Sequence, residues 1–153
     1  MAKVNWKPQG MNSVMASFAV EGCADALEAY KKVFGAKEHS RAPDPSGKKV
    51  WHADFSIGDS HVFMNDYMPE MGMSKPGGAG LWVYLEDADQ AFDRAKTAGW
   101  KVLMPMADQF WGDRTGTLMD RWGNTWTVAK HVKDMTPEEM MKAGQEFAKS
   151  MKK

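Results

Sequence analysis

The chain has 153 residues, enough for one domain with a hydrophobic core that needs neither disulfides nor a structural metal. Its 20 basic and 20 acidic residues cancel, so its charge gives no reason to expect nucleic acid or a membrane surface as a partner. A single cysteine, a polar N-terminus unlike a signal peptide and the lack of any apolar run of roughly 18 residues indicate a cytoplasmic protein.

The first half of the chain predicts a strand, a helix and a hairpin. A β-rich run at residues 14–20 is followed by apolar residues at helical spacing over residues 22–35, where a glycine ends the helix. Residues 50–57 alternate as a strand, a tight turn lies at Gly58, and residues 60–65 pair back.

The second half repeats this order of elements. A strand is expected first, then a helix that Asp87 caps, then extended segments around a turn at 121–124. The expected elements are a strand at 80–85, a helix at 87–99, an extended segment at 101–106, and strands at 115–119 and 125–130.

Glycine positions indicate that the two halves arose by duplication. The glycines that end the helices, Gly35 and Gly99, are 64 positions apart, and the hairpin glycines, Gly58 and Gly123, are 65 positions apart. Two unrelated kinds of turn with nearly the same offset are typical of a repeated supersecondary unit.

We therefore expect a single domain over residues 1–153 with four parts. These are a first βαβββ module at 13–65, a linker or lid at 66–79, a second βαβββ module at 80–131 and a C-terminal helix at 136–151. The helix begins with a capping box at Thr136. Its apolar stripe of Met140, Ala143, Phe147 and Met151 must cover either the sheet or a second subunit.

Alternation along the strands predicts two sheet faces of different character. Val14, Trp51, Phe55 and Val83 belong to an apolar face under a helix. The opposite face mixes polar and aromatic side chains, namely Met15, Ser17, His52, Asp54, Trp82, Tyr84 and Thr127. Such a mixture is typical of a ligand cup, and the alternative is a face that meets water or another chain.

Three segments resemble a known family. Residues 20–36 (VEGCADALEAYKKVFGA) and 52–59 (HADFSIGD) resemble the vicinal oxygen chelate superfamily, which unites glyoxalases, bleomycin resistance proteins and dioxygenases. Residues 108–131 (DQFWGDRTGTLMDRWGNTWTVAKH) resemble its PhnB-like branch. The resemblance implies an α+β fold in which two tandem βαβββ modules form curled mixed sheets around a cavity, commonly in homodimers.

The resemblance also implies where a metal would be held. The family's metal enzymes place histidine or glutamate at positions that correspond here to Met15, His52, Gly80 and Thr127. Only His52 is a suitable ligand, whereas a catalytic zinc normally has three protein ligands. We therefore expect no metal, and the alternative is one divalent metal held by His52 together with Asp54.

The histidines differ in their expected roles. His52 is a candidate general base, with Asp54 on the same face to orient it or raise its pKa. The alternative is a hydrogen-bonded structural histidine. His61 and His131 are expected to be solvated at strand ends, and His39 falls in loop-like sequence.

Residues 111–114 are expected to bend the chain before a strand. Arg114 is a candidate partner for a carboxylate or phosphate of a ligand, and the alternative is an ion pair with Asp113 or Asp120. Trp111 either forms a wall of the cup or covers a strand edge. Cys23, at a helix start without a thiolate relay, is expected to be a small filler.

Two functions remain at this point. The first is a small-molecule-binding protein without the family's metal site, with Trp82, Tyr84 and Trp111 contacting a planar ligand. The second is a lyase, isomerase or transferase type of enzyme that uses His52, with or without a metal. Both are expected as homodimers, and fold alone does not decide between them.

Overall fold

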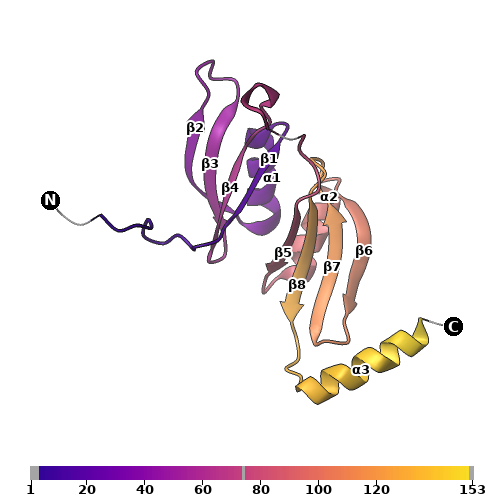
Figure 1. Ribbon diagram of the computed structural model, residues 1–153. Helices are drawn as coiled ribbons and strands as arrows, with labels where there is room; N and C mark the ends of the chain where they lie inside the picture. The colour runs from indigo at the N-terminus through magenta and orange to yellow at the C-terminus, as the bar shows by residue number, and fades with distance from the viewer. Residues whose placement is uncertain (1–3, 74, 152–153) are drawn as a thin grey trace. The chain divides into compact units, whose positions relative to one another are not determined.

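A computed structural model describes residues 4–73 and 75–151, and the chain divides into two compact units, Met1–Gly77 and Gly78–Lys153 (Figure 1). Each unit contains a helix and a four-stranded mixed sheet in the order βαβββ, and the second unit adds a C-terminal helix. The predicted α+β class, the two modules and the C-terminal helix are confirmed. Within the described residues, no helix combines the length and the apolar character that spanning a bilayer requires.

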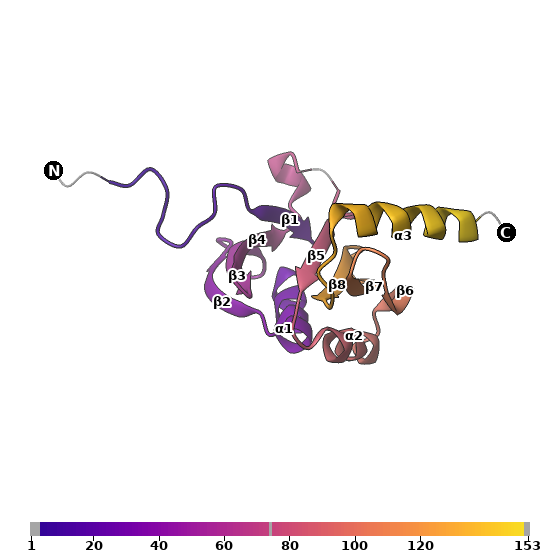
Figure 2. The same cartoon turned by 90° about the horizontal axis from the view of Figure 1, so that it is seen from below.

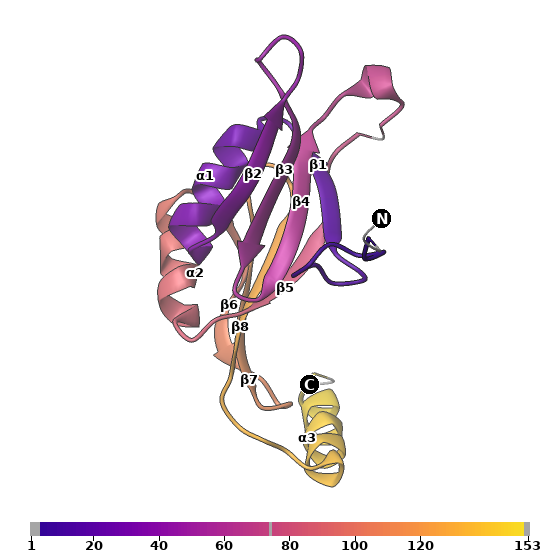
Figure 3. The same cartoon turned by 90° about the vertical axis from the view of Figure 1, so that its left-hand side faces the viewer.

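The first unit forms a sheet with the strand order β1-β4-β3-β2 (Figure 3). β1 runs parallel to β4, and the other neighbours are antiparallel. Its elements are β1 (Ala16–Val20), α1 (Cys23–Phe34), β2 (Lys37–Pro43), β3 (Val50–Ile57) and β4 (Ser60–Asp66). The predicted linker at 66–79 contains a short 3-10 helix, η1 (Pro69–Met71), and residue 74 of this segment lies outside the described residues.

The second unit repeats this topology with the strand order β5-β8-β7-β6. Its elements are β5 (Gly80–Tyr84), α2 (Ala88–Thr97), β6 (Lys101–Asp108), β7 (Asp113–Met119), β8 (Thr125–His131) and α3 (Pro137–Ser150). Figure 2 shows α2 and α3 on opposite sides of this sheet. The capping box predicted at the start of α3 is present, because Thr136 and Glu139 hydrogen-bond each other's backbone N–H.

The glycines that indicated duplication hold matching places in the two units. Gly35 and Gly99 follow α1 and α2 with φ angles of +69° and +85°, a conformation that glycine adopts without strain. Gly58 and Gly123 lie in the turns that join β3 to β4 and β7 to β8. The predicted repeat is therefore confirmed.

Each helix covers the apolar face of its own sheet. In the first unit, Tyr30 of α1 contacts Phe55 of β3, with ring centroids 5.9 Å apart and both side chains fully buried. In the second, Phe92 of α2 lies so close to Gly116 of β7 that a Cβ there would come within 2.6 Å of its ring. Glycine at position 116 lets the helix approach the sheet closely.

Three expectations about the first unit were wrong. β2 is a strand that includes His39, which was expected in loop-like sequence, because an edge strand exposed on both faces needs no apolar alternation. Val14 precedes β1 and is exposed, so it is not part of the core. Trp51 near the start of β3 is 48% exposed, whereas Ala53 and Phe55 on the same strand are buried under α1 as predicted.

Asp66, the last residue of β4, joins three elements of the first unit. One carboxylate oxygen accepts hydrogen bonds from the backbone N–H groups of Gly22 (2.9 Å) and Cys23 (2.8 Å), and the other accepts from Val50 (2.7 Å). The N-cap Gly22 has no side chain of its own to satisfy the free amides at the start of α1, so Asp66 does this instead.

Burial, together with the charge of Asp66, raises the pKa of the Cys23 thiol to about 12, which agrees with the expected role of a small filler.

Replacing the carboxylate of Asp66 by an amide should destabilise the first unit. Asp66→Asn is expected to lower the free energy of unfolding by about 1–3 kcal/mol, because an amide leaves at least one buried backbone N–H without an acceptor. Urea denaturation measures the change. Asp59→Asn, in an exposed turn of the same unit, is the control and should shift stability by less than about 0.5 kcal/mol. Equal stability of Asp66→Asn and the wild type would contradict this anchoring role.

Candidate functional site

The face of the second sheet opposite α2 carries the exposed aromatic residues. Val83 of β5 is buried, while its neighbours Trp82 and Tyr84 are 50% and 58% exposed, as alternation predicts. Trp82 pairs in register with Thr127 of β8, so the two share this face, and the Thr127 hydroxyl lies 3.1 Å from that of Thr117. The predicted ligand residues Trp82, Tyr84 and Thr127 therefore lie on one sheet face.

Asp113, at the start of β7, is the polar centre of this face. Its side chain is buried, and one carboxylate oxygen accepts hydrogen bonds from the Tyr84 hydroxyl (2.8 Å) and the Trp111 indole N–H (3.1 Å). The other oxygen lies 2.8 Å from Nδ1 of His131, whose Nε2 lies 3.0 Å from Asp134. One carboxylate thus connects β5, β7, the end of β8 and the loop before β7.

Gly112 makes this arrangement possible. Its φ angle is +96°, and a Cβ there would come within 2.2 Å of the backbone oxygen of Lys133. Its own carbonyl accepts hydrogen bonds from the backbone N–H groups of Val132 and Lys133, both at 3.0 Å. The tight bend lets the indole of Trp111 turn back onto the carboxylate two residues later.

The hydrogen bonds in this cluster shift the titration of its members. Burial raises the pKa of Asp113, but the hydrogen bonds from His131, Tyr84 and Trp111 outweigh burial and leave that pKa below its usual value. The hydrogen bond to Asp113, followed by the one to Asp134, raises the pKa of His131. The hydrogen bond to Asp113 also raises the pKa of Tyr84. At neutral pH the cluster therefore contains a carboxylate and a protonated phenol.

Two rings bonded to this carboxylate, Tyr84 and Trp111, and a third ring beside both of them, Trp82, are called here the aromatic patch. The ring centroid of Trp82 lies 6.2 Å from that of Tyr84 and 6.5 Å from that of Trp111. Phe110 stands edge-on to Trp111 at 5.1 Å and contacts Phe147 of α3 at 5.3 Å. Trp111 thus lies beside Trp82, and a line of rings connects it to α3.

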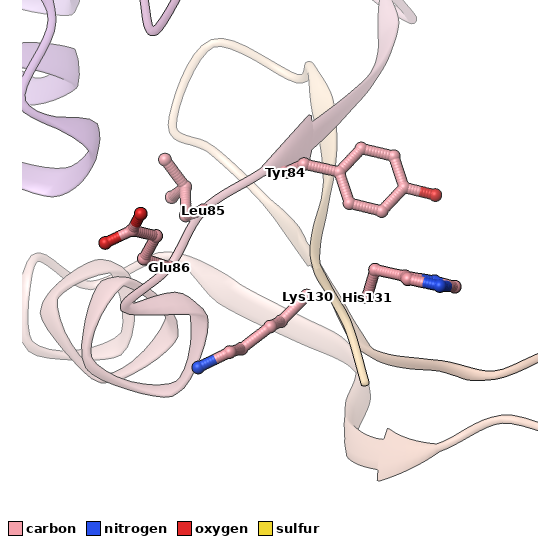
Figure 4. A pocket seen from close by; sticks show the side chains of 5 residues that line it. All are labelled: Tyr84, Leu85, Glu86, Lys130 and His131. Carbon is pink, nitrogen blue, oxygen red and sulfur yellow. The ribbon is translucent and has the colours of Figure 1, made fainter. Parts of the chain in front are cut away.

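An open pocket of about 430 Å³ adjoins the aromatic patch at the end of β5 and β8. Its lining residues are Tyr84, Leu85, Glu86, Lys130 and His131. Figure 4 shows the Tyr84 ring and the His131 imidazole on one side of the strands, while the charged groups of Glu86 and Lys130 point to the other side. The pocket wall next to the patch is therefore formed by a phenol ring and an imidazole.

Arg114 lies on the opposite face of β7. Its guanidinium forms hydrogen bonds of 2.8–3.1 Å with both carboxylate oxygens of Asp89 on α2, and a further bond of 3.2 Å with Asp108. The alternative prediction, an ion pair of Arg114 with Asp113 or Asp120, was therefore wrong. Its role as a ligand residue remains a prediction, but the structure does not bring it together with the aromatic patch.

The first unit carries the remaining predicted residues on the face opposite α1. Ser17 of β1 pairs in register with Phe63 of β4, whose ring meets that of His52 edge-on at 4.6 Å. Met15 precedes β1 and is half-buried. Asp54 lies on this face too, but its carboxylate is 2.7 Å from Nδ1 of His61. The carboxylate expected to orient His52 is thus bonded to another histidine.

Two histidines were given the wrong surroundings by sequence reasoning. His61 is half-buried and paired with Asp54, where a solvated side chain was expected. His39 lies in β2, 2.9 Å from the Ser56 hydroxyl, and its ring stacks on that of His61 at 4.6 Å. A strand at 37–43 would have placed His39 beside β3, but the polar sequence gave no such signal.

The residues at the family's metal positions do not fit a metal centre. Met15 offers a thioether, Gly80 has no side chain, and the Thr127 hydroxyl is hydrogen-bonded to Thr117, which leaves His52 as one suitable ligand. Within residues 4–73 and 75–151, no three His, Cys, Asp or Glu side chains are grouped so that they could hold a metal ion.

The chain is similar to known proteins in both sequence and structure. Residues 10–128 match the family model of the Glyoxalase/Bleomycin resistance protein/Dioxygenase superfamily. The uncharacterized protein Mb0911c of Mycobacterium bovis is 35% identical over 132 residues, which span 81% of this chain and 86% of that protein. The crystal structure of TioX from Micromonospora sp. ML1 aligns with a TM-score of 0.63 and 26% identity, covering 79% of this chain and 100% of TioX.

A PhnB protein from Bacillus cereus shares the fold, with a TM-score of 0.59 and 16% identity over 78% of this chain and 99% of that protein. The family match extends from before β1 into β8 and so includes nearly all of both βαβββ modules. The chain therefore belongs to the Glyoxalase/Bleomycin resistance protein/Dioxygenase superfamily.

Proposed function

We propose that this protein binds a planar small molecule on the aromatic patch of its second unit. The observation that carries the proposal is that the three rings are partly exposed while the polar edges of two of them are already hydrogen-bonded. Trp82 and Tyr84 leave about half of their surface exposed, while the polar edges of Tyr84 and Trp111 are already bonded to Asp113. What these rings offer a ligand is therefore mainly their apolar faces.

Fixed ring faces favour binding for two physical reasons. A planar ligand that covers them removes apolar surface from water and gains aromatic contact. Because Asp113 holds Tyr84 and Trp111 in place, less side-chain freedom is lost when the ligand binds. Exposed aromatic surface of this kind on one sheet face is typical of an interaction site.

Membership of the family is compatible with binding of a small molecule, but it does not decide between binding and catalysis. The family's description names a resistance protein beside two kinds of enzyme, so the residues of the site must decide. The donor set at the family's metal positions does not suit metal-assisted chemistry, which favours binding without a metal. We place this function in the cytoplasm, in agreement with the single cysteine.

The first test is truncation of the central ring. Planar aromatics such as quinoline should quench tryptophan fluorescence saturably, and Trp82→Ala should weaken binding by more than about 1 kcal/mol through the loss of stacking and contact area. Trp51→Ala is the matched control, because Trp51 is equally exposed but lies in the first unit. Equal affinity of Trp82→Ala and Trp51→Ala would contradict a site on the patch.

An enzyme that uses His52 is the second candidate, and one observation favours it. The imidazole of His52 is exposed on a sheet face, where it meets the ring of Phe63. If His52 is a general base, His52→Ala should abolish turnover and leave ligand affinity nearly unchanged. If the protein only binds, His52→Ala should affect affinity less than Trp82→Ala does. The two mutants therefore separate the two functions.

Metal analysis tests the binding of an ion directly. Protein purified without added metal should contain much less than one equivalent of zinc, nickel, manganese or iron, because His52 alone does not supply a ligand set. Added ions should hardly shift the melting temperature, since an ion that binds the folded state stabilises it. One equivalent of ion that is lost in His52→Ala would overturn the proposal of a metal-free protein.

We also propose that the protein forms a homodimer through α3. Met140, Phe147 and Met151 expose much of their surface along this helix, and Val102, Leu103 and Met104 are exposed on the edge strand β6. A second copy would bury this apolar area. Light scattering should therefore give about twice the 17.1 kDa mass of one chain, and Phe147→Glu should lower that mass. A monomer at high protein concentration would contradict the proposal.

A further inference from the structure

We infer that the ligand of the aromatic patch is a planar cation, such as a fused aromatic ring system with a quaternary nitrogen. The inference rests on the proposed function and adds the charge of the ligand to it. It is drawn from the charges around the patch and from the hydrogen bonds that hold its rings. Cations bind to the faces of aromatic rings, and Trp and Tyr are the best such rings.

Carboxylates outnumber cationic groups beside the patch. Asp113 is bonded to Tyr84 and Trp111, and Asp134 is bonded to the far nitrogen of His131. One imidazole therefore stands between two carboxylates. Asp113, Asp134 and His131 together carry net negative charge whether the imidazole is protonated or neutral. This cluster therefore attracts a cation and repels an anion.

The nearby basic side chains are directed elsewhere. Arg114 lies on the other face with its acidic partners, and the ammonium of Lys130 points away from the patch (Figure 4). Lys133 lies near enough to Glu139 of α3 for its charge to contribute to the lowered pKa of that carboxyl, although hydrogen bonds to Thr136 are the larger cause. Lys101 shares the face of the patch by register, but it pairs with the far end of β7, about 20 Å along the strand from Asp113. Among the described residues of the second unit, His131 is therefore the cationic group bonded to the two carboxylates, and even when protonated it balances one of them.

The hydrogen bonds to Asp113 also improve the rings as cation sites. When the Tyr84 hydroxyl and the Trp111 indole N–H donate to a carboxylate, electron density moves into their rings. The face of an aromatic ring is the negative end of its quadrupole, so added density strengthens its attraction for a cation. A neutral ligand gains only contact with these faces, whereas a cation of the same shape gains charge attraction as well.

Three probes of similar shape and different charge test the inference by isothermal titration calorimetry near neutral pH at low salt. These are N-methylquinolinium, neutral quinoline and anionic 1-naphthoate. N-methylquinolinium should bind about ten-fold more tightly than quinoline, the size expected of a partly desolvated cation–ring contact, and 1-naphthoate should bind most weakly. Added salt should reduce the difference, because it screens the carboxylates.

Two variants assign the preference to the carboxylate cluster. Asp113→Asn should bring the two affinities close together by removing the negative charge bonded to the edges of Tyr84 and Trp111. If this variant does not fold, His131→Gln serves instead and is compared with the wild type below pH 6.5, where the imidazole is protonated because its pKa lies above that ordinary value. The variant then removes a positive charge and keeps an amide that can donate to Asp113. His131→Gln should tighten N-methylquinolinium binding by roughly two- to five-fold and leave quinoline unchanged. Lys96→Gln, which removes an exposed cation on α2, is the matched control and should change neither affinity.

The outcomes separate this inference from the function on which it rests. If quinoline or 1-naphthoate binds as tightly as N-methylquinolinium and binding depends on Trp82, the protein binds planar ligands but the inferred charge is wrong. An unchanged preference for the cation in a folded Asp113→Asn, or in His131→Gln, also overturns the inference. If no probe binds saturably, or if Trp82→Ala binds all three as the wild type does, the proposed function itself fails.

Discussion

The buried carboxylate of Asp113 is the interaction on which the second unit's open face depends. It receives the Tyr84 hydroxyl from β5, the Trp111 indole from the preceding loop and the His131 imidazole from the end of β8. A buried carboxylate is stable only when its oxygens are hydrogen-bonded, so burial and the aromatic arrangement depend on each other. The bend at Gly112 brings the indole to the carboxylate, and Trp82 and Tyr84 beside it keep about half of their surface exposed.

The two units share one topology but use their buried acidic residues differently. In the first unit, Asp66 binds only backbone N–H groups and so fixes the start of α1 and β3. On the open face of that unit, Asp54 binds an imidazole, and a second imidazole stacks on the first. In the second unit, the acidic residue at the open face binds two aromatic donors as well as an imidazole. The duplicated framework therefore carries a histidine-rich face in one unit and an aromatic face in the other.

Sequence reasoning predicted those features that depend on local pattern. Helix-ending and turn glycines located the repeat, and alternation in β3 and β5 placed Phe55 inside and Trp82 and Tyr84 outside. β2 was missed because an edge strand exposed on both faces has no apolar alternation to detect. Alternation along a strand predicts which sheet face a residue lies on, but it does not predict which residues that side chain contacts.

The partners within each face depend on register and on chain bends, which local pattern does not contain. Asp54 was expected to act with His52, two residues before it on the same strand. In the sheet, His61 comes from β4, which pairs with β3, and it takes that carboxylate. Asp113 was overlooked as a site residue because β7 was expected to begin at Thr115, two residues too late. Arg114 was assigned to the ligand for the same reason, since its face could not be judged without the strand.

The line of rings from Trp111 through Phe110 to Phe147 has a thermodynamic consequence. Phe110 touches both an element of the aromatic patch and the helix proposed to pair with a second copy. A ligand that changes the position of the Trp111 ring must also change the position of Phe110 and its contact with Phe147 of α3. Linkage then requires reciprocity: the factor by which self-association alters ligand affinity equals the factor by which the ligand alters self-association. The concentration of the protein would thereby act as an effector of its own binding site.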